Sequence, residues 1–181
     1  MLLCLVALAW VPSWAAAAQA AEDAGLLEYR VKAAFLYRFA GYVDWPPAAF
    51  ARPDTPVTIA VMGAAELATE LEQAVTGRTI SNRTVLVKRL KSGDSLVGVH
   101  VLFVGKAEAA WLAQLLQTAQ TRSILTVTES EGALRQGSVI NFTIAEQRVR
   151  FEISIDSAEK NGIKLSSRLL SVAQRVVTGT P

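Results

Sequence analysis

The sequence contains one cysteine and one histidine in 181 residues, so several kinds of chemistry lack their usual side chains. A lone cysteine cannot form a disulfide within the chain, and these two residues supply too few ligands for a zinc site. His100 lies between Val99 and Val101 in an apolar run, away from any nucleophile motif, which favours a buried structural histidine over a catalytic base. We therefore expect no metal, no cofactor and no enzymatic activity.

An excess of charge of one sign is also missing. The chain has 18 Lys and Arg residues against 16 Asp and Glu residues, a formal net charge of +2. Proteins that bind nucleic acids use a basic stripe on the phosphate backbone, so this balance disfavours a nucleic-acid partner. Gly63 follows an apolar run but belongs to neither the G-x-G-x-x-G nor the G-K-[ST] pattern, so a phosphate-binding loop is not indicated.

The first twenty residues contain no charged side chain. They run from a nearly continuous apolar stretch into Ala18-Gln19-Ala20, a small-x-small pattern typical of signal-peptide cleavage. No segment reaches the roughly 18 consecutive apolar residues of a membrane-spanning helix. We therefore predict a signal peptide over residues 1–20, cleaved near Ala20, and an exported soluble domain over 21–181 that is not embedded in the membrane. Cys4 lies in the predicted leader, which leaves the mature domain without a thiol.

Helical patterns alternate with β-branched apolar runs through the first two thirds of the mature chain. The expected helices are 26–41, 64–75 and 107–118, and the expected strands are Val57–Met62, Thr84–Leu90, Val99–Gly105 and Ile124–Thr128. This alternation predicts βαβ crossovers. We expect a single α/β domain whose mainly parallel sheet has helices on both faces.

The rhythm changes after Val139. Two runs, Val139–Ile144 and Arg148–Ile155, flank a turn near Ala145–Gln147 and predict an antiparallel hairpin. Asp156 or Ser157 is expected to cap a short helical turn that ends at Asn161–Gly162. A final helix is expected over Ser166–Val177, docked against the sheet.

Two groups of side chains suggest interaction or chemistry. An aromatic set is denser than average and is expected to lie mostly in the core: Tyr37, Phe39, Tyr42, Trp45 and Phe50. Tyr42 and Trp45 adjoin Pro46-Pro47, and their exposed parts would suit a partner-binding patch. Glu129 and Glu131 flank Ser130, and such a cluster after a strand favours a polar loop or helix cap over a catalytic pair.

An ordered set of segments carries a resemblance to the YfiR family of periplasmic proteins. Near the start are Val31–Ala40 and Val43-Asp44-Trp45-Pro46; near the end are Val149–Ile153, Ala158, Gly162–Ser167 and Leu169-Leu170. Between them, Gly77–Ile80, His100–Val104 and Leu125–Thr128 fall in the family's order. The resemblance covers nearly the whole mature chain, and the ordered set is more specific than any one motif.

The resemblance implies a regulatory role in the periplasm. Members of this family repress a membrane diguanylate cyclase by contacting its periplasmic sensor domain, which would control cyclic di-GMP and biofilm formation. It also implies a shallow ligand pocket around the last strand and the following turn, where this chain has Glu152, Lys160, Lys164 and Ser166. The alternative function is a periplasmic small-molecule-binding module for an anionic or nucleotide-like ligand.

This chain departs from the family in its cysteines. The best-known members have cysteine pairs, and many carry a cysteine where this chain has Val99. A disulfide switch therefore cannot operate here. The routes left for releasing repression are a competing partner and a small ligand. The sequence leaves the signal, the partner's output domain and the oligomeric state open, a homodimer included.

Overall fold

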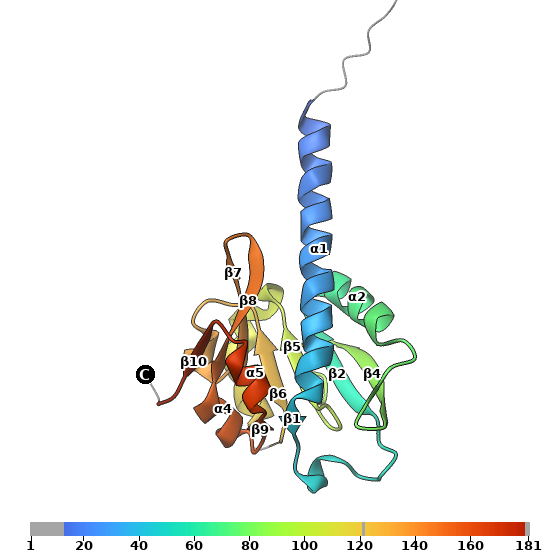
Figure 1. Cartoon of the computed structure of the whole chain (residues 1–181), viewed down its shortest axis with the longest axis vertical. Helices are drawn as coiled ribbons and strands as arrows, with labels where there is room; N and C mark the ends of the chain where they lie inside the picture. The colour runs from blue at the N-terminus through green and yellow to red at the C-terminus, as the bar shows by residue number, and fades with distance from the viewer. Residues whose placement is uncertain (1–12, 121, 180–181) are drawn as a thin grey trace, which may run out of the picture.

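A large sheet organises the computed structural model, which describes residues 13–120 and 122–179 (Figure 1). Its eight strands lie in the spatial order β10, β8, β7, β6, β5, β2, β4, β3. Their bounds are β2 Val57–Met62, β3 Thr79–Ile80, β4 Arg83–Leu90, β5 Val101–Val104, β6 Leu125–Thr128, β7 Ile140–Ala145, β8 Arg148–Ser154 and β10 Arg175–Val177. Among the described strands of this sheet, only the β7–β8 and β3–β4 pairs are antiparallel. The predicted α/β class, mainly parallel sheet and hairpin are confirmed.

Helices cover both faces of the sheet, as predicted. Helices α1 (Ser13–Gly41) and α2 (Ala65–Val75) share a buried apolar cluster with Ile59 and Phe103. On the other face, a 3₁₀ turn (Lys106–Trp111) leads into α3 (Leu112–Ala119), which packs with Met62. Strands β2 and β5 are buried along their whole length because both faces are covered.

The hairpin turn falls where the sequence places it. Glu146 and Gln147 separate β7 from β8, and both have a positive φ, 51° and 58°. Two such residues form the type I′ turn whose twist matches that of paired strands. Along β8, Phe151 and Ile153 face the core while Arg148 and Arg150 are exposed, so the predicted alternation is confirmed there.

A second, two-stranded sheet ties the end of α1 to the C-terminal region. Strand β1 (Val43–Asp44) pairs antiparallel with β9 (Lys164–Leu165). The Ser166 backbone N–H donates to the Tyr42 carbonyl oxygen at 2.9 Å. Two short helices flank β9, α4 (Ile155–Lys160) before it and α5 (Ser167–Ser171) after it. Two segments far apart in the sequence therefore lie side by side.

The predicted final helix over Ser166–Val177 is wrong. Helix α5 ends at Ser171, and β10 then runs parallel to β8. The Gln174 N–H donates to the Phe151 carbonyl at 2.9 Å, and the Arg175 guanidinium holds the Glu152 carboxylate at 2.8 and 2.9 Å. These contacts, together with the strand preference of β-branched valines, outweigh the helical pattern.

Two helix ends also differ from the expectation. Helix α4 is capped by Ser154, whose hydroxyl accepts from the Ser157 N–H at 3.2 Å, and not by Asp156 or Ser157. The described part of helix α1 extends upstream of residue 26 to Ser13, because this alanine-rich segment has high helix propensity, and Figure 1 shows it extending beyond the sheet. Of the predicted leader, residues 1–12 lie outside the described residues. Its cleavage stays a prediction.

Candidate functional site

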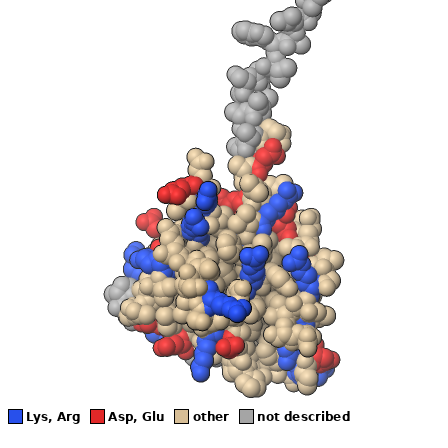
Figure 2. All heavy atoms as spheres, in the orientation of Figure 1, with Lys and Arg blue, Asp and Glu red and all other residues tan. Residues whose placement is uncertain are grey.

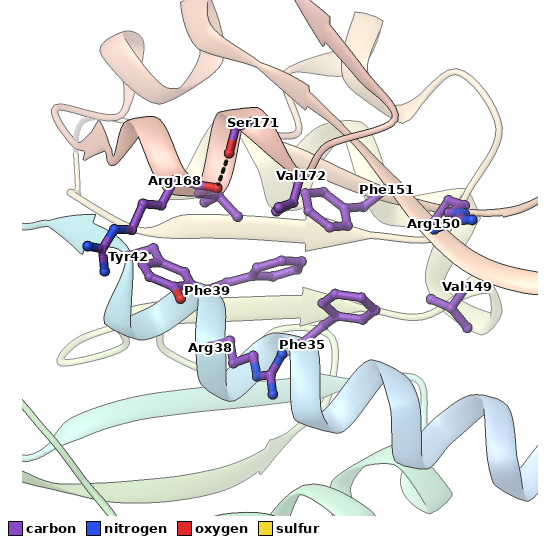
Figure 3. Close-up of a pocket in the computed structure, with 11 residues that line it drawn as sticks. Phe35, Arg38, Phe39, Tyr42, Val149, Arg150, Phe151, Arg168, Ser171 and Val172 are labelled. Atoms are coloured by element: carbon purple, nitrogen blue, oxygen red, sulfur yellow. Dashed lines mark hydrogen bonds between the residues drawn. The ribbon is translucent and has the colours of Figure 1, made fainter.

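A pocket of about 500 Å³ opens between α1, β8 and α5 (Figure 3). The residues that line it are Phe35, Arg38, Phe39, Tyr42, Val149, Arg150, Phe151, Arg168, Leu169, Ser171 and Val172. The pocket therefore depends on three segments that are distant in the sequence. Helix α5 can close one side only because the β1–β9 pairing brings it to the end of α1.

The floor of the pocket is aromatic and tightly packed. The Phe39 and Phe151 rings meet edge to face with centroids 4.8 Å apart, and Phe35 lies 5.4 Å from Phe151. Phe39 and Phe151 are buried, whereas Phe35 is half-buried at the pocket wall. Edge-to-face pairs at these distances are favourable, so the floor is a rigid apolar surface.

Three arginines, Arg38, Arg150 and Arg168, surround this floor, one each from α1, β8 and α5. All three are exposed, and none has a side-chain hydrogen bond or ion pair within residues 13–120 and 122–179. Among the described residues that line the pocket, none carries a carboxylate. Figure 2 shows basic side chains across the middle of this face. The planar guanidinium of arginine can donate two parallel hydrogen bonds to a carboxylate or a phosphate. The pocket therefore combines hydrogen-bond donors for an anion with a flat apolar surface.

The structure brings some of the sequence-predicted site residues together. Tyr42, Lys164 and Ser166 meet at the β1–β9 sheet, where Asp44 lies opposite Lys164 and Ser166 bonds to Tyr42. Trp45 follows β1 directly. Lys164 is exposed, and Tyr42, Trp45 and Ser166 are half-buried. Tyr42 alone of the predicted residues also lines the pocket in Figure 3.

The other two predicted residues lie apart from this group. Glu152 pairs with Arg175 and lines a smaller pocket of about 230 Å³ beside residues 131–135. Lys160 is exposed at the end of α4. The carboxylate of Glu152 thus serves to fix β10 against β8.

Trp45 is held by a stack of rings beneath the loop between β1 and β2. Its indole meets the His100 ring edge to face at 6.0 Å, and Phe50 stacks on His100 at 4.5 Å. The Arg83 guanidinium covers Phe50 at 4.0 Å. The same guanidinium donates to three loop carbonyls, those of Arg52, Pro53 and Thr55, at 2.6–3.2 Å.

His100 is buried and makes two hydrogen bonds. Its Nδ1 accepts from the Thr58 backbone N–H, and its Nε2 donates to the Ala49 carbonyl, both at 3.1 Å. Burial lowers the pKa of His100, and the charge of Arg83 lowers it further, against the opposing hydrogen bond to Ala49. The prediction of a structural histidine is confirmed, and the ring positions the loop that carries Trp45.

Glu129 belongs to a buried ion cluster that the sequence analysis missed. Lys32, on the packed face of α1, donates to Glu129 at 2.6 Å and also pairs with Glu28 one turn away. The second oxygen of Glu129 accepts from the Lys106 N–H at 3.1 Å. Burial by itself lowers the pKa of Lys32, but the hydrogen bonds to Glu129 and Glu28 raise it overall. The cluster fixes α1 to the carboxyl end of β6.

The crevice in which parallel α/β sheets commonly bind ligands is closed in this chain. It would lie between β2 and β5, where the chain turns in opposite directions. A Cβ on Gly105 would lie 2.5 Å from the Gly63 carbonyl oxygen, so the two strand ends touch.

Among the described residues, no group of three or more His, Cys, Asp or Glu side chains could hold a metal ion. No described helix combines the length and hydropathy required to cross a membrane.

Comparison with known proteins adds a family and a distant structure. The model of a family described as YfiR/HmsC-like matches residues 29–174. A search of curated proteins finds no match. Among solved structures, a conserved domain protein from Vibrio cholerae O1 biovar El Tor is 10% identical, with a TM-score of 0.49. The match covers 66% of this chain and 54% of that protein, so this chain spans about half of its length.

Proposed function

Because the chain belongs to the YfiR/HmsC-like family, we propose that it is a periplasmic regulator of a membrane-bound signalling enzyme. In this proposal the enzyme is a diguanylate cyclase, and the protein represses it by contacting its periplasmic sensor domain. The observation that carries the proposal is the extent of the family match, because residues 29–174 include all of β1, β9 and the pocket. The role requires an interface and no catalytic group.

The contact is proposed to occur at a docking surface made of Tyr42, Trp45, Lys164 and Ser166. The β1–β9 pairing and the His100 ring stack hold this surface rigid, which lowers the entropy lost on binding. Tryptophan and tyrosine are enriched among residues that dominate binding energy. Lys164 adds an exposed positive charge that would favour an acidic surface on the partner.

A second role rests on the pocket. Its aromatic floor and three arginines support binding of an amphipathic anion with a flat apolar part, such as a nucleotide or an aromatic carboxylate. Tyr42 belongs to both the pocket and the docking surface, so a bound ligand would touch a residue of the interface. Such a ligand would supply the release that cysteine pairs supply in other family members.

The regulatory role is tested in cells of the source organism. Deleting the gene is expected to raise cyclic di-GMP and surface attachment, and a wild-type copy is expected to reverse both changes. Unchanged cyclic di-GMP after deletion would show that the regulated enzyme is not a diguanylate cyclase.

The docking surface is tested by complementation with Trp45→Ala, Lys164→Glu and an exposed control, Gln73→Ala, on α2. Truncation of a binding hot spot costs about 2 kcal/mol or more, so the first two variants should fail to repress while the control succeeds. Trp45 also packs inside the protein, so circular dichroism must show that its variant is folded. Full repression by the folded Trp45→Ala and Lys164→Glu variants would refute this surface.

A further inference from the structure

Strand β4 leaves most of one edge without a neighbour. Its inner edge pairs with β2 from Val85 to Leu90, whereas β3 reaches only Thr84 and Arg83 on the outer edge. Within residues 13–120 and 122–179, no strand lies beyond Val85–Leu90. Figure 1 shows β4 at the outer edge of the sheet, alongside α2. The backbone groups of such an edge are available to pair with another chain.

A groove lies where the side chains of an added strand would fall. It has a volume of about 500 Å³ and lies between the C-terminal half of α2, the following turn and residues 84–87 of β4. Val85 and Val87 are half-buried on the α2 side, next to Val75. On the opposite side of β4, Leu86 is 44% exposed and Lys88 is exposed. The groove on one side therefore has an apolar strip of Val75, Val85 and Val87 among polar residues, and the other side has an exposed leucine beside a cation.

The charges along β4 indicate which kind of chain could pair with its outer edge. Arg89 is paired with Glu72 at 2.9 Å, whereas Lys88 makes no ion pair among the described residues. If β4 paired with β4 of a second copy, the lysines of both copies would lie on the same two-stranded unit. Like charges on neighbouring strands destabilise strand pairing. An exposed lysine on an edge thus disfavours self-association but matches a partner of opposite charge.

We propose that the outer edge of β4 binds an extended segment of a partner protein in which apolar side chains alternate with acidic ones. The segment would add a strand beside Val85–Leu90, with its apolar side chains in the groove and its carboxylates near Lys88. Backbone hydrogen bonds would supply affinity, and the two faces would supply specificity. This edge shares no residue with the docking surface or the arginine pocket, so it is independent of the function proposed above.

The test uses the purified full mature chain, labelled with ¹⁵N, and a synthetic capped peptide that alternates valine and glutamate. A second peptide has lysine in place of glutamate. The acidic peptide is expected to shift the backbone amide signals of Val85–Leu90 and to slow hydrogen exchange at every second one of them, those whose N–H points away from β2, while the basic peptide does neither. The proposal is overturned by unaffected β4 amides, by equal binding of both peptides, or by shifts confined to the arginine pocket.

A charge reversal gives a second readout. Lys88→Glu is expected to weaken binding of the acidic peptide by about fivefold, the effect of one cross-strand ion pair, and to favour the basic peptide. The control Lys91→Glu changes an exposed residue beyond the end of β4 and should leave both affinities unchanged. Amide spectra of both variants report folding. An unaltered preference in folded Lys88→Glu, or dimerisation of the unliganded wild-type chain through β4, would refute the proposal.

Discussion

Removing the Lys32 amine should be among the most damaging single changes to the stability of this protein. The Lys32 and Glu129 side chains are only 2% and 9% exposed, so solvent screens their attraction weakly. Breaking a buried ion pair by deleting one partner costs about 3 to 5 kcal/mol, because the other charge stays buried. Glu28 contributes less, since a third of its side chain is exposed and helical pairs of this spacing contribute about 0.3 to 0.5 kcal/mol.

The cost is measured by urea denaturation of Lys32→Met, Glu129→Gln and the double variant. Each single variant should lose about 3 kcal/mol or more of unfolding free energy. The double variant should lose less than the sum of the two, because no uncompensated charge remains in this pair. The control Arg52→Ala removes the partner of Asp54 in a pair whose side chains are 76% and 77% exposed, and it should cost less than about 1 kcal/mol.

The pH dependence has a defined sign. The pKa of Lys32 is raised in the folded protein, so its contribution to the free energy of unfolding is complete below the ordinary lysine pKa of about 10.4 and declines as pH rises above it.

In the urea experiment, single-variant losses below about 1 kcal/mol, or fully additive losses in the double variant, would refute this account of the cluster.

Two further predictions concern His100 and the pocket. Because burial lowers the pKa of His100, the unfolded chain binds its proton more readily, and the free energy of unfolding should fall as pH drops below about 6.5. Urea denaturation at pH 5.5 and 7.5 should show a smaller fall in His100→Gln, and equal falls would contradict the prediction. In the pocket, Arg150→Ala should weaken calorimetric binding of a nucleoside monophosphate by about tenfold, as loss of a charge-assisted hydrogen bond implies. Arg148→Ala, on the same strand but outside the pocket, should bind normally; equal affinities would place the ligand elsewhere.

The parallel sheet could be predicted because its evidence is local. Strands buried on both faces appear as continuous apolar runs, and β2 is buried at all six positions. The C-terminal strand could not be predicted in this way. Val176 and Val177 fit the apolar side of a helix as well as a strand. The contacts that decide between them join Gln174 to Phe151 and Arg175 to Glu152, 23 positions apart in each case.

The candidate site was only partly predictable for the same reason. Local composition points to Tyr42 and Trp45, the family resemblance points to Lys164, and the β1–β9 pairing places the three residues together. The arginines of the pocket each resemble an ordinary solvated residue in their own segment. The role of Lys32 could not be predicted either, because its partner Glu129 is 97 positions away in the sequence. Local periodicity indicates which side of an element is polar, but it does not indicate which polar sides meet.

The geometry links the two proposed binding events through the β1–β9 sheet. The chain leaves the pocket wall at Tyr42 and enters β1, and it leaves β9 through Ser166 to reach Arg168 on the opposite wall. A ligand that draws these walls together therefore acts on both strands that support Trp45 and Lys164. Linkage is reciprocal, so any factor by which the ligand weakens partner binding is the factor by which the partner weakens ligand binding. If the leader with Cys4 is cleaved as predicted, ligand concentration would be able to switch the protein without any thiol, provided that the ligand prefers the form that is not bound to the partner.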